Sequence, residues 1–183
     1  MIYHLSLQAA GIAAGIFLLL VGLAGLVLPG NSKAFATSLP RSRVAGIILL
    51  TIAAIWSFWL LATMEMGEFS SFRRPLLFLL PVGYVLVVWF VSEFLAVRAL
   101  GMIFLLAAEP LLDAAFLRHE TSRLLVTVFA YVLIVKGIVW VTMPYRLRDH
   151  IGWSTRSTGR WMLLHAGALL YGVALLFLAL TVY

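Results

Sequence analysis

The chain has 183 residues, of which 64% are hydrophobic and 11% are charged, and it contains no cysteine. A water-soluble domain of this length needs more polar residues to cover its surface, so the composition predicts a protein embedded in lipid. The absence of cysteine excludes disulfides, thiolate metal ligands and a catalytic cysteine. The net charge of +6 is typical of loops that face anionic lipid, and no Lys- or Arg-rich arm indicates nucleic-acid binding.

Continuous apolar runs predict transmembrane helices, each of which needs about 20 residues to cross a bilayer. The first run lacks a preceding basic segment and exceeds the apolar core of a typical signal peptide, so we interpret it as a retained helix. The stretch from Pro75 to Leu117 would form a straight helix of about 64 Å and must turn back. We place the turn at the polar break "VRALG", Val97 to Gly101. The predicted spans of this single domain, residues 1–183, are 5–28, 43–64, 75–97, 101–117, 122–143 and 160–182.

The distribution of Lys and Arg between the loops predicts the orientation of the chain. The first, third and fifth loops hold eight of these residues, whereas the second and fourth hold four. Because Lys and Arg accumulate on the cytoplasmic side, both termini are expected to face away from the cytoplasm. The basic residues of the fifth loop, which we expect to contact anionic lipid, are Arg146, Arg148, Arg156 and Arg160.

An internal repeat relates the two ends of the chain. The segment that begins at Phe17 aligns with the segment that begins at Tyr131. The aligned pairs are Gly22 with Gly137, Pro29 with Pro144, and Arg43 with Arg160. In each copy a glycine precedes a proline by seven residues, a basic loop follows, and an arginine opens the next helix. The predicted fold is therefore an all-α integral membrane protein of six transmembrane helices with a duplicated helical hairpin.

This order of glycine, proline, basic loop and arginine resembles the small YjeT-like two-helix inner-membrane proteins of bacteria, and it is also similar to hairpins of DoxX-like membrane proteins. The resemblance covers the two end hairpins, about residues 17–52 and 131–168. It implies a location in the bacterial cytoplasmic membrane, and it implies no particular activity.

Small residues follow one face of the first predicted helix. They are Gly11, Gly15, Gly22 and Gly25, at spacings of four, seven and three residues. Such a face lets the backbone of another helix approach closely. Packing within this chain and contact with another subunit both explain the pattern.

Several polar side chains fall within the predicted spans. They are Lys136, Glu109, Glu93, His165, Asp113 and Tyr131. An unpaired charge inside the membrane costs at least about 2.5–3.5 kcal/mol, so we expect the charged groups to find partners or water. Counting about 1.5 Å per residue places Lys136 within about 5 Å of the depth of Glu109, and Glu93 at the depth of His165. These two ion pairs are therefore predicted, with snorkelling of Lys136 to the membrane surface as the alternative.

The sequence offers little for catalysis or cofactor binding. One histidine within a span provides no second haem ligand, and the His and carboxylate pattern supports a metal site poorly, so no cofactor is expected. Glu109 and Asp113 lie one helical turn apart, with His119 and Glu120 nearby, which is compatible with a membrane hydrolase. No nucleophile motif accompanies these residues, and we do not favour an enzyme.

We expect a non-enzymatic subunit or scaffold that packs in a larger membrane protein complex. Small size, short loops and few convergent polar groups favour this function, and lipid and other membrane subunits would be its partners. The alternative is a small transporter or a proton or ion pathway, because repeats and buried charges are typical of transporters. That pathway would use Lys136, Glu109, Glu93 and His165.

Overall fold

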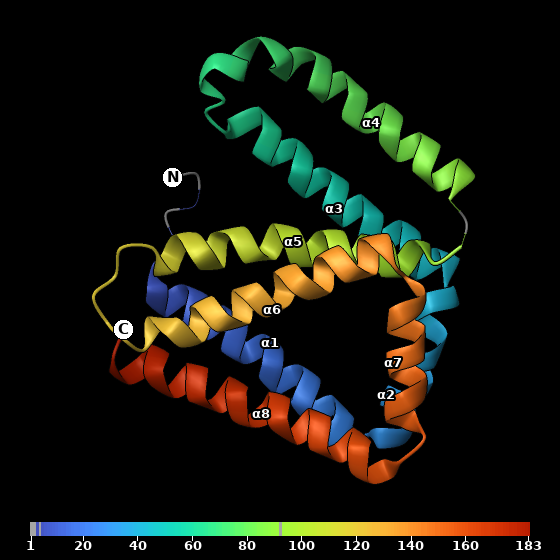
Figure 1. The fold of residues 1–183 in the computed structure, drawn as a ribbon, viewed down its shortest axis with the longest axis vertical. Coiled ribbons are helices and arrows are strands. Elements are labelled where there is room, and N and C mark those ends of the chain that lie inside the picture. Colours follow the sequence, from blue (N-terminus) through green and yellow to red (C-terminus); the bar gives the residue numbers. More distant parts are fainter. Residues whose placement is uncertain (1–2, 4, 92) are drawn as a thin grey trace.

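The structure is a computed structural model that describes residues 3, 5–91 and 93–183. Within them the chain forms eight α-helices and two short 3-10 helices (Figure 1). These are α1 (Leu7–Val27), α2 (Pro29–Ser38), η1 (Leu39–Arg41), α3 (Arg43–Thr63), η2 (Gly67–Phe72), α4 (Arg73–Phe90), α5 (Leu95–Ala115), α6 (Arg123–Thr142), α7 (Tyr145–Thr155) and α8 (Thr158–Thr181). Six segments, namely α1, α3, η2 with α4, α5, α6 and α8, are long and apolar enough to cross a membrane. This confirms the prediction of an all-α chain with six apolar helices of spanning length.

The central apolar stretch turns back between Phe90 and Leu95, so the predicted break at Val97 to Gly101 is wrong. Phe94 adopts a left-handed backbone with φ of 55° and reverses the chain immediately before α5. Gly101 lies inside α5, where its small size serves helix packing: a Cβ atom there would lie 2.9 Å from the carbonyl oxygen of Gly137 on α6. The glycine that indicated a turn is therefore a contact between helices.

The helices pack in two main antiparallel pairs, α1 with α8 and α5 with α6 (Figure 1). Helix α3 packs on α5 near Gly46, where a Cβ atom would lie 2.8 Å from the backbone nitrogen of Ala96. From this point α3 leads away from α5, and α4 packs on α3 at the edge of the molecule (Figure 1). Helix α4 is described completely, and none of its residues is buried.

All four glycines of the α1 face are buried against α8. A Cβ atom at Gly22 would lie 2.9 Å from both the carbonyl oxygen of His165 and the backbone nitrogen of Leu169. One at Gly25 would overlap the imidazole ring of His165. The glycine face therefore packs within the chain, and α8 covers the surface that we considered for another subunit.

The two ends of the chain share an order of elements. In each, a long apolar helix is followed by a short helix that begins at or just after a proline, and then by a second long helix. Pro29 is the first residue of α2, and Pro144 precedes α7. The long helices of each end are not main packing partners, because α1 pairs with α8 while α3 and α6 both pack on α5. Helix α8 touches α6 near one end, where the Tyr171 hydroxyl donates a hydrogen bond of 2.8 Å to the Leu125 carbonyl oxygen. The shared order fits a duplication, which stays a prediction, but neither end forms a compact hairpin.

Candidate functional site: an acidic wedge between α3 and α5

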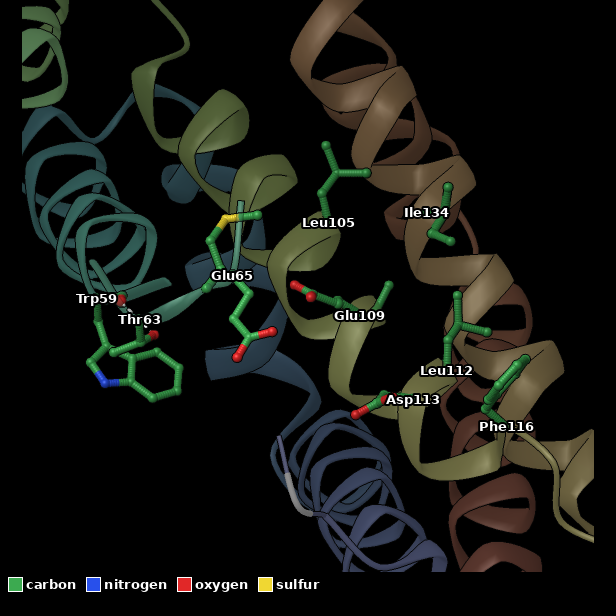
Figure 2. Close-up of a pocket in the computed structure, with 11 residues that line it drawn as sticks. Trp59, Thr63, Glu65, Leu105, Glu109, Leu112, Asp113, Phe116 and Ile134 are labelled. Atoms are coloured by element: carbon green, nitrogen blue, oxygen red, sulfur yellow. Dashed lines mark hydrogen bonds between the residues drawn. The ribbon is translucent and has the colours of Figure 1, made fainter. Parts of the chain in front are cut away.

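A cavity of about 1040 Å³ opens where α3 and α5 diverge (Figure 2). We call it the wedge. Trp59, Thr63 and Glu65 line one side of it, from the C-terminal part of α3 and the segment that follows. Helix α5 contributes the opposite side, with Glu109 and Asp113 among its lining residues. The wedge exists because α3 and α5 meet closely at Gly46 and separate toward the other end.

Three carboxylates share the wedge. Figure 2 shows the side chains of Glu65, Glu109 and Asp113 around the same open space. In the described part of the chain, the only ion pair within 4.0 Å joins Arg148 to Asp149, so no basic side chain neutralises these three acids at that distance. Nor does any group of three His, Asp or Glu side chains among those residues have the arrangement of a metal site. The wedge is therefore acidic, and among the described residues its carboxylates have no counter-ion within 4.0 Å.

Tyr3 lies at the rim of the wedge. The Tyr3 hydroxyl accepts a hydrogen bond of 2.6 Å from Trp56 Nε1, and its ring lies 5.5 Å from that of Trp59. A cavity of about 410 Å³ beside the wedge is lined by Tyr3, Asp113 and Arg118. Burial raises the pKa of Tyr3 above 10.0; the bond from Trp56 opposes this rise and the Glu109 charge adds to it. Tyr3 therefore stays protonated and supplies a neutral hydroxyl at the rim.

The predicted ion pair between Lys136 and Glu109 is not formed, since these described side chains do not approach within 4.0 Å. The contact of Gly101 with Gly137 sets the register of α5 and α6. It puts Lys136 about 10 Å along the helix pair from the level of Glu109, at about 1.5 Å per residue. The sequence prediction began this helix at residue 101, whereas α5 begins at Leu95. The predicted middle of the helix was therefore Glu109. Lys136 instead lines a second cavity, with residues of α7.

The second predicted pair, Glu93 with His165, is absent as well. Glu93 is exposed in the connection between α4 and α5, outside the spans. His165 packs in the contact between α8 and α1, where its ring lies 4.2 Å from that of Trp161 and its Nδ1 lies 2.8 Å from the Trp161 carbonyl oxygen. Trp161 Nε1 donates a 2.9 Å hydrogen bond to the carbonyl oxygen of Gly25. His165 therefore belongs to a packing cluster.

The remaining predicted residues lie on the surface. Tyr131 is exposed on α6. The arginines of the fifth loop, Arg146, Arg148, Arg156 and Arg160, are exposed on or beside α7. Arg148 also lies over the ring of Phe94, and Arg160 over that of Trp153, at 5.9 and 5.0 Å from the ring centroids. The sequence prediction missed α7 as a helix. Its buried residues, Leu147 and Ser154, are seven apart and therefore lie on one face of a helix.

No protein-family profile matches this chain, and no characterised protein or solved structure shows significant similarity to it. Function is therefore inferred from the geometry. The wedge combines carboxylates with aromatic and aliphatic side chains and is open to the outside. Such a site can attract cations or basic side chains.

Proposed function

We propose that this chain is a non-enzymatic subunit of a larger membrane protein complex, and that a partner packs against α4 and the wedge. The observation that carries the proposal is the position of α4, which buries no residue and packs mainly on α3 and η2. Every other spanning helix buries at least four of its residues within the chain. A second protein that packs on α4 would complete its surroundings.

The charges of the wedge support a partner. Lipid covers apolar helices well, but it leaves an unpaired carboxylate at a cost of at least about 2.5–3.5 kcal/mol inside the bilayer. Glu109 and Asp113 lie on a spanning helix and have no ion-pair partner among the described residues. A partner helix that carries Lys or Arg would neutralise them at the side where the wedge is open.

The proposal includes a location and an orientation. The resemblance of the end hairpins to small bacterial inner-membrane proteins supports the bacterial cytoplasmic membrane. The excess of basic residues in and beside the first and fifth loops supports a cytoplasmic position for α2 and α7 and a non-cytoplasmic position for both termini. In this orientation the wedge opens toward the non-cytoplasmic side.

Site-specific photocrosslinking in intact membranes tests the proposal. A benzophenone side chain is placed on α4 at Val82 or Leu86, which are 54% and 47% exposed. The controls carry it on α8 at Leu163 or Leu170, which are 75% and 69% exposed. We expect a protein adduct of one fixed mass from α4 and lipid adducts alone from α8.

Charge reversal at Glu109 tests whether the adduct from α4 depends on the carboxylates of the wedge. Glu109→Lys should repel a cationic partner, so the adduct from Val82 should fall several-fold and the partner should no longer co-purify in fixed stoichiometry. Lipid adducts alone at all four positions would contradict the proposal. An adduct between two copies of this chain would contradict a hetero-complex.

The geometry supports a proton or ion pathway, the alternative function, less well than it supports a subunit of a complex. Three carboxylates around one cavity favour it. Its other proposed members lie apart, because Lys136 faces α7, Glu93 lies in a connection and His165 packs on α1. Proton or cation flux into liposomes that depends on Glu109 would favour the pathway; flux equal in the Glu109→Gln variant would exclude a path through this residue.

A further inference from the structure

A second cavity, of about 500 Å³, lies between the C-terminal half of α6 and the short helix α7. Its polar lining consists of Lys136 from α6 with Arg146, Asp149 and His150 from α7. Trp140, Tyr145 and Trp153 complete its aromatic wall. We call it the lysine cavity. It shares no lining residue with the wedge.

The charges of the lysine cavity favour an anion. Among the described residues Lys136 has no carboxylate within 4.0 Å. The one acid in the lining, Asp149, accepts hydrogen bonds of 3.0 and 2.9 Å from Nε and a terminal nitrogen of Arg148 at its Oδ1. The pKa of His150 is lowered below 6.5, mainly by burial and further by the positive charge of Lys136. Lys136 and Arg146 therefore bring two positive charges to a cavity whose acid is already engaged.

The position of the lysine cavity relative to the spans indicates which kind of anion it would bind. Lys136 lies about 9 Å before the end of α6, at about 1.5 Å per residue. A lysine side chain at this depth directs its ammonium toward the membrane surface. The Trp and Tyr side chains of the wall are the residues that prefer the level of lipid headgroups. The site is therefore placed at the boundary between headgroups and acyl chains.

An apolar surface continues from the lysine cavity along α6. Val135 lines the cavity itself and is 61% exposed, and Val132, one turn earlier in the helix, is 41% exposed. A ligand with both an anionic group and a hydrocarbon tail would match the cavity and this surface together. A soluble phosphate would use only the polar part.

We propose that the lysine cavity binds the headgroup phosphate of an anionic glycerophospholipid. Lys136 and Arg146 donate hydrogen bonds to the phosphate oxygens, and an acyl chain lies along α6 at Val132 and Val135. Zwitterionic phosphatidylcholine binds more weakly, because its quaternary ammonium group is repelled by the same two cations. This site explains a lysine within an apolar helix, and it does not depend on the proposed partner of α4.

Native mass spectrometry of the purified full chain tests the proposal. The protein is titrated with phosphatidylglycerol, with phosphatidylcholine of the same acyl chains and with inorganic phosphate. We expect phosphatidylglycerol to bind with at least tenfold preference over phosphatidylcholine, and inorganic phosphate at the same concentration to leave this binding unchanged. Equal binding of the two lipids, or displacement of the lipid by phosphate, would overturn the proposal.

Variants locate the binding site. One basic side chain near a membrane surface contributes about fivefold to the affinity for anionic lipid, so Lys136→Gln with Arg146→Gln should lose about 25-fold. Arg43→Gln removes an exposed arginine at the start of α3, outside the cavity, and should change the affinity less than twofold. Lys136→Arg should retain binding. Equal losses in the double variant and in Arg43→Gln would show diffuse attraction and overturn the site, and unchanged unfolding midpoints without lipid verify that the variants are folded.

Discussion

The contact of α1 with α8 can be tested with two glycines of the same helix. Gly172 faces α1: a Cβ atom there would lie 2.9 Å from the carbonyl oxygen of Gly15 and 3.0 Å from the backbone nitrogen of Leu19. Both neighbours are backbone atoms, so rotation of a side chain does not relieve the clash. Gly167 lies five residues earlier in α8, and a Cβ atom there would meet nothing within 4 Å. Alanine is therefore tolerated at Gly167 and forces the two helices apart at Gly172.

The expected difference in the free energy of unfolding follows from two effects. Alanine in place of glycine favours the helix by about 0.5–1 kcal/mol at either position. Overpacking at Gly172 costs about 1–3 kcal/mol, because two backbones must separate. The propensity effect cancels between the variants, so Gly172→Ala should be less stable than Gly167→Ala by about 1–3 kcal/mol.

Reversible unfolding in mixed micelles, followed by circular dichroism as the fraction of sodium dodecyl sulfate increases, measures this difference. The Gly167→Ala variant should be at least as stable as the unmodified chain. Adding Gly15→Ala to Gly172→Ala should cost less than the sum of the single changes, because the helices are already separated. If Gly172→Ala and Gly167→Ala unfold at the same midpoint, α1 and α8 do not approach each other as described.

Three other predictions concern charge. In a double-mutant cycle, Lys136→Leu and Glu109→Leu should be additive to within about 0.5 kcal/mol of unfolding free energy, because the side chains form no ion pair; a coupling well above this would restore the pair. A cysteine at Ser70 should react with an impermeant maleimide in intact cells, whereas one at Thr158 should not, and the reverse pattern would invert the proposed orientation. Burial, with the Lys136 charge, lowers the pKa of His150 in the folded chain below 6.5. Below pH 6.5 the unfolded chain therefore binds more protons than the folded chain. The free energy of unfolding should thus fall as the pH decreases from 6.5 toward the lowered pKa. In detergent without anionic lipid, His150→Gln should reduce this dependence, and an unchanged dependence would contradict the shift.

The spanning helices could be predicted from the sequence because length and hydropathy are local properties. The turn between α4 and α5 could not, because it uses Phe94 in a left-handed conformation that its residue type does not favour. The glycine chosen for the turn, Gly101, has the same sequence signature whether it turns a chain or admits a neighbouring helix. Only its contact with Gly137 distinguishes the two roles.

The candidate sites depended on contacts between distant segments. The ion pairs were predicted from depth alone, and the misplaced start of α5 shifted Glu109 toward Lys136. His165 was assigned a charged partner although it packs in the close contact of α8 with α1, which joins opposite ends of the sequence. The sequence did not predict the wedge, because Glu65 lies outside a span. It lines the same cavity as Glu109 only because α3 and α5 diverge.

The angle between α3 and α5 depends on particular residues, and it opens the proposed partner site. At one end, Gly46 lets α3 approach the backbone of α5. At the other, Trp56 and Trp59 pack with Tyr3, whose bulk occupies space beside α3 and is held by a hydrogen bond. A glycine at the narrow end and aromatic rings at the wide end accompany the divergence of α3 from α5. The acidic groups of α5 are thereby left open on one side, and the same divergence carries α4 to the edge of the molecule, where a partner that binds the carboxylates would also pack against it.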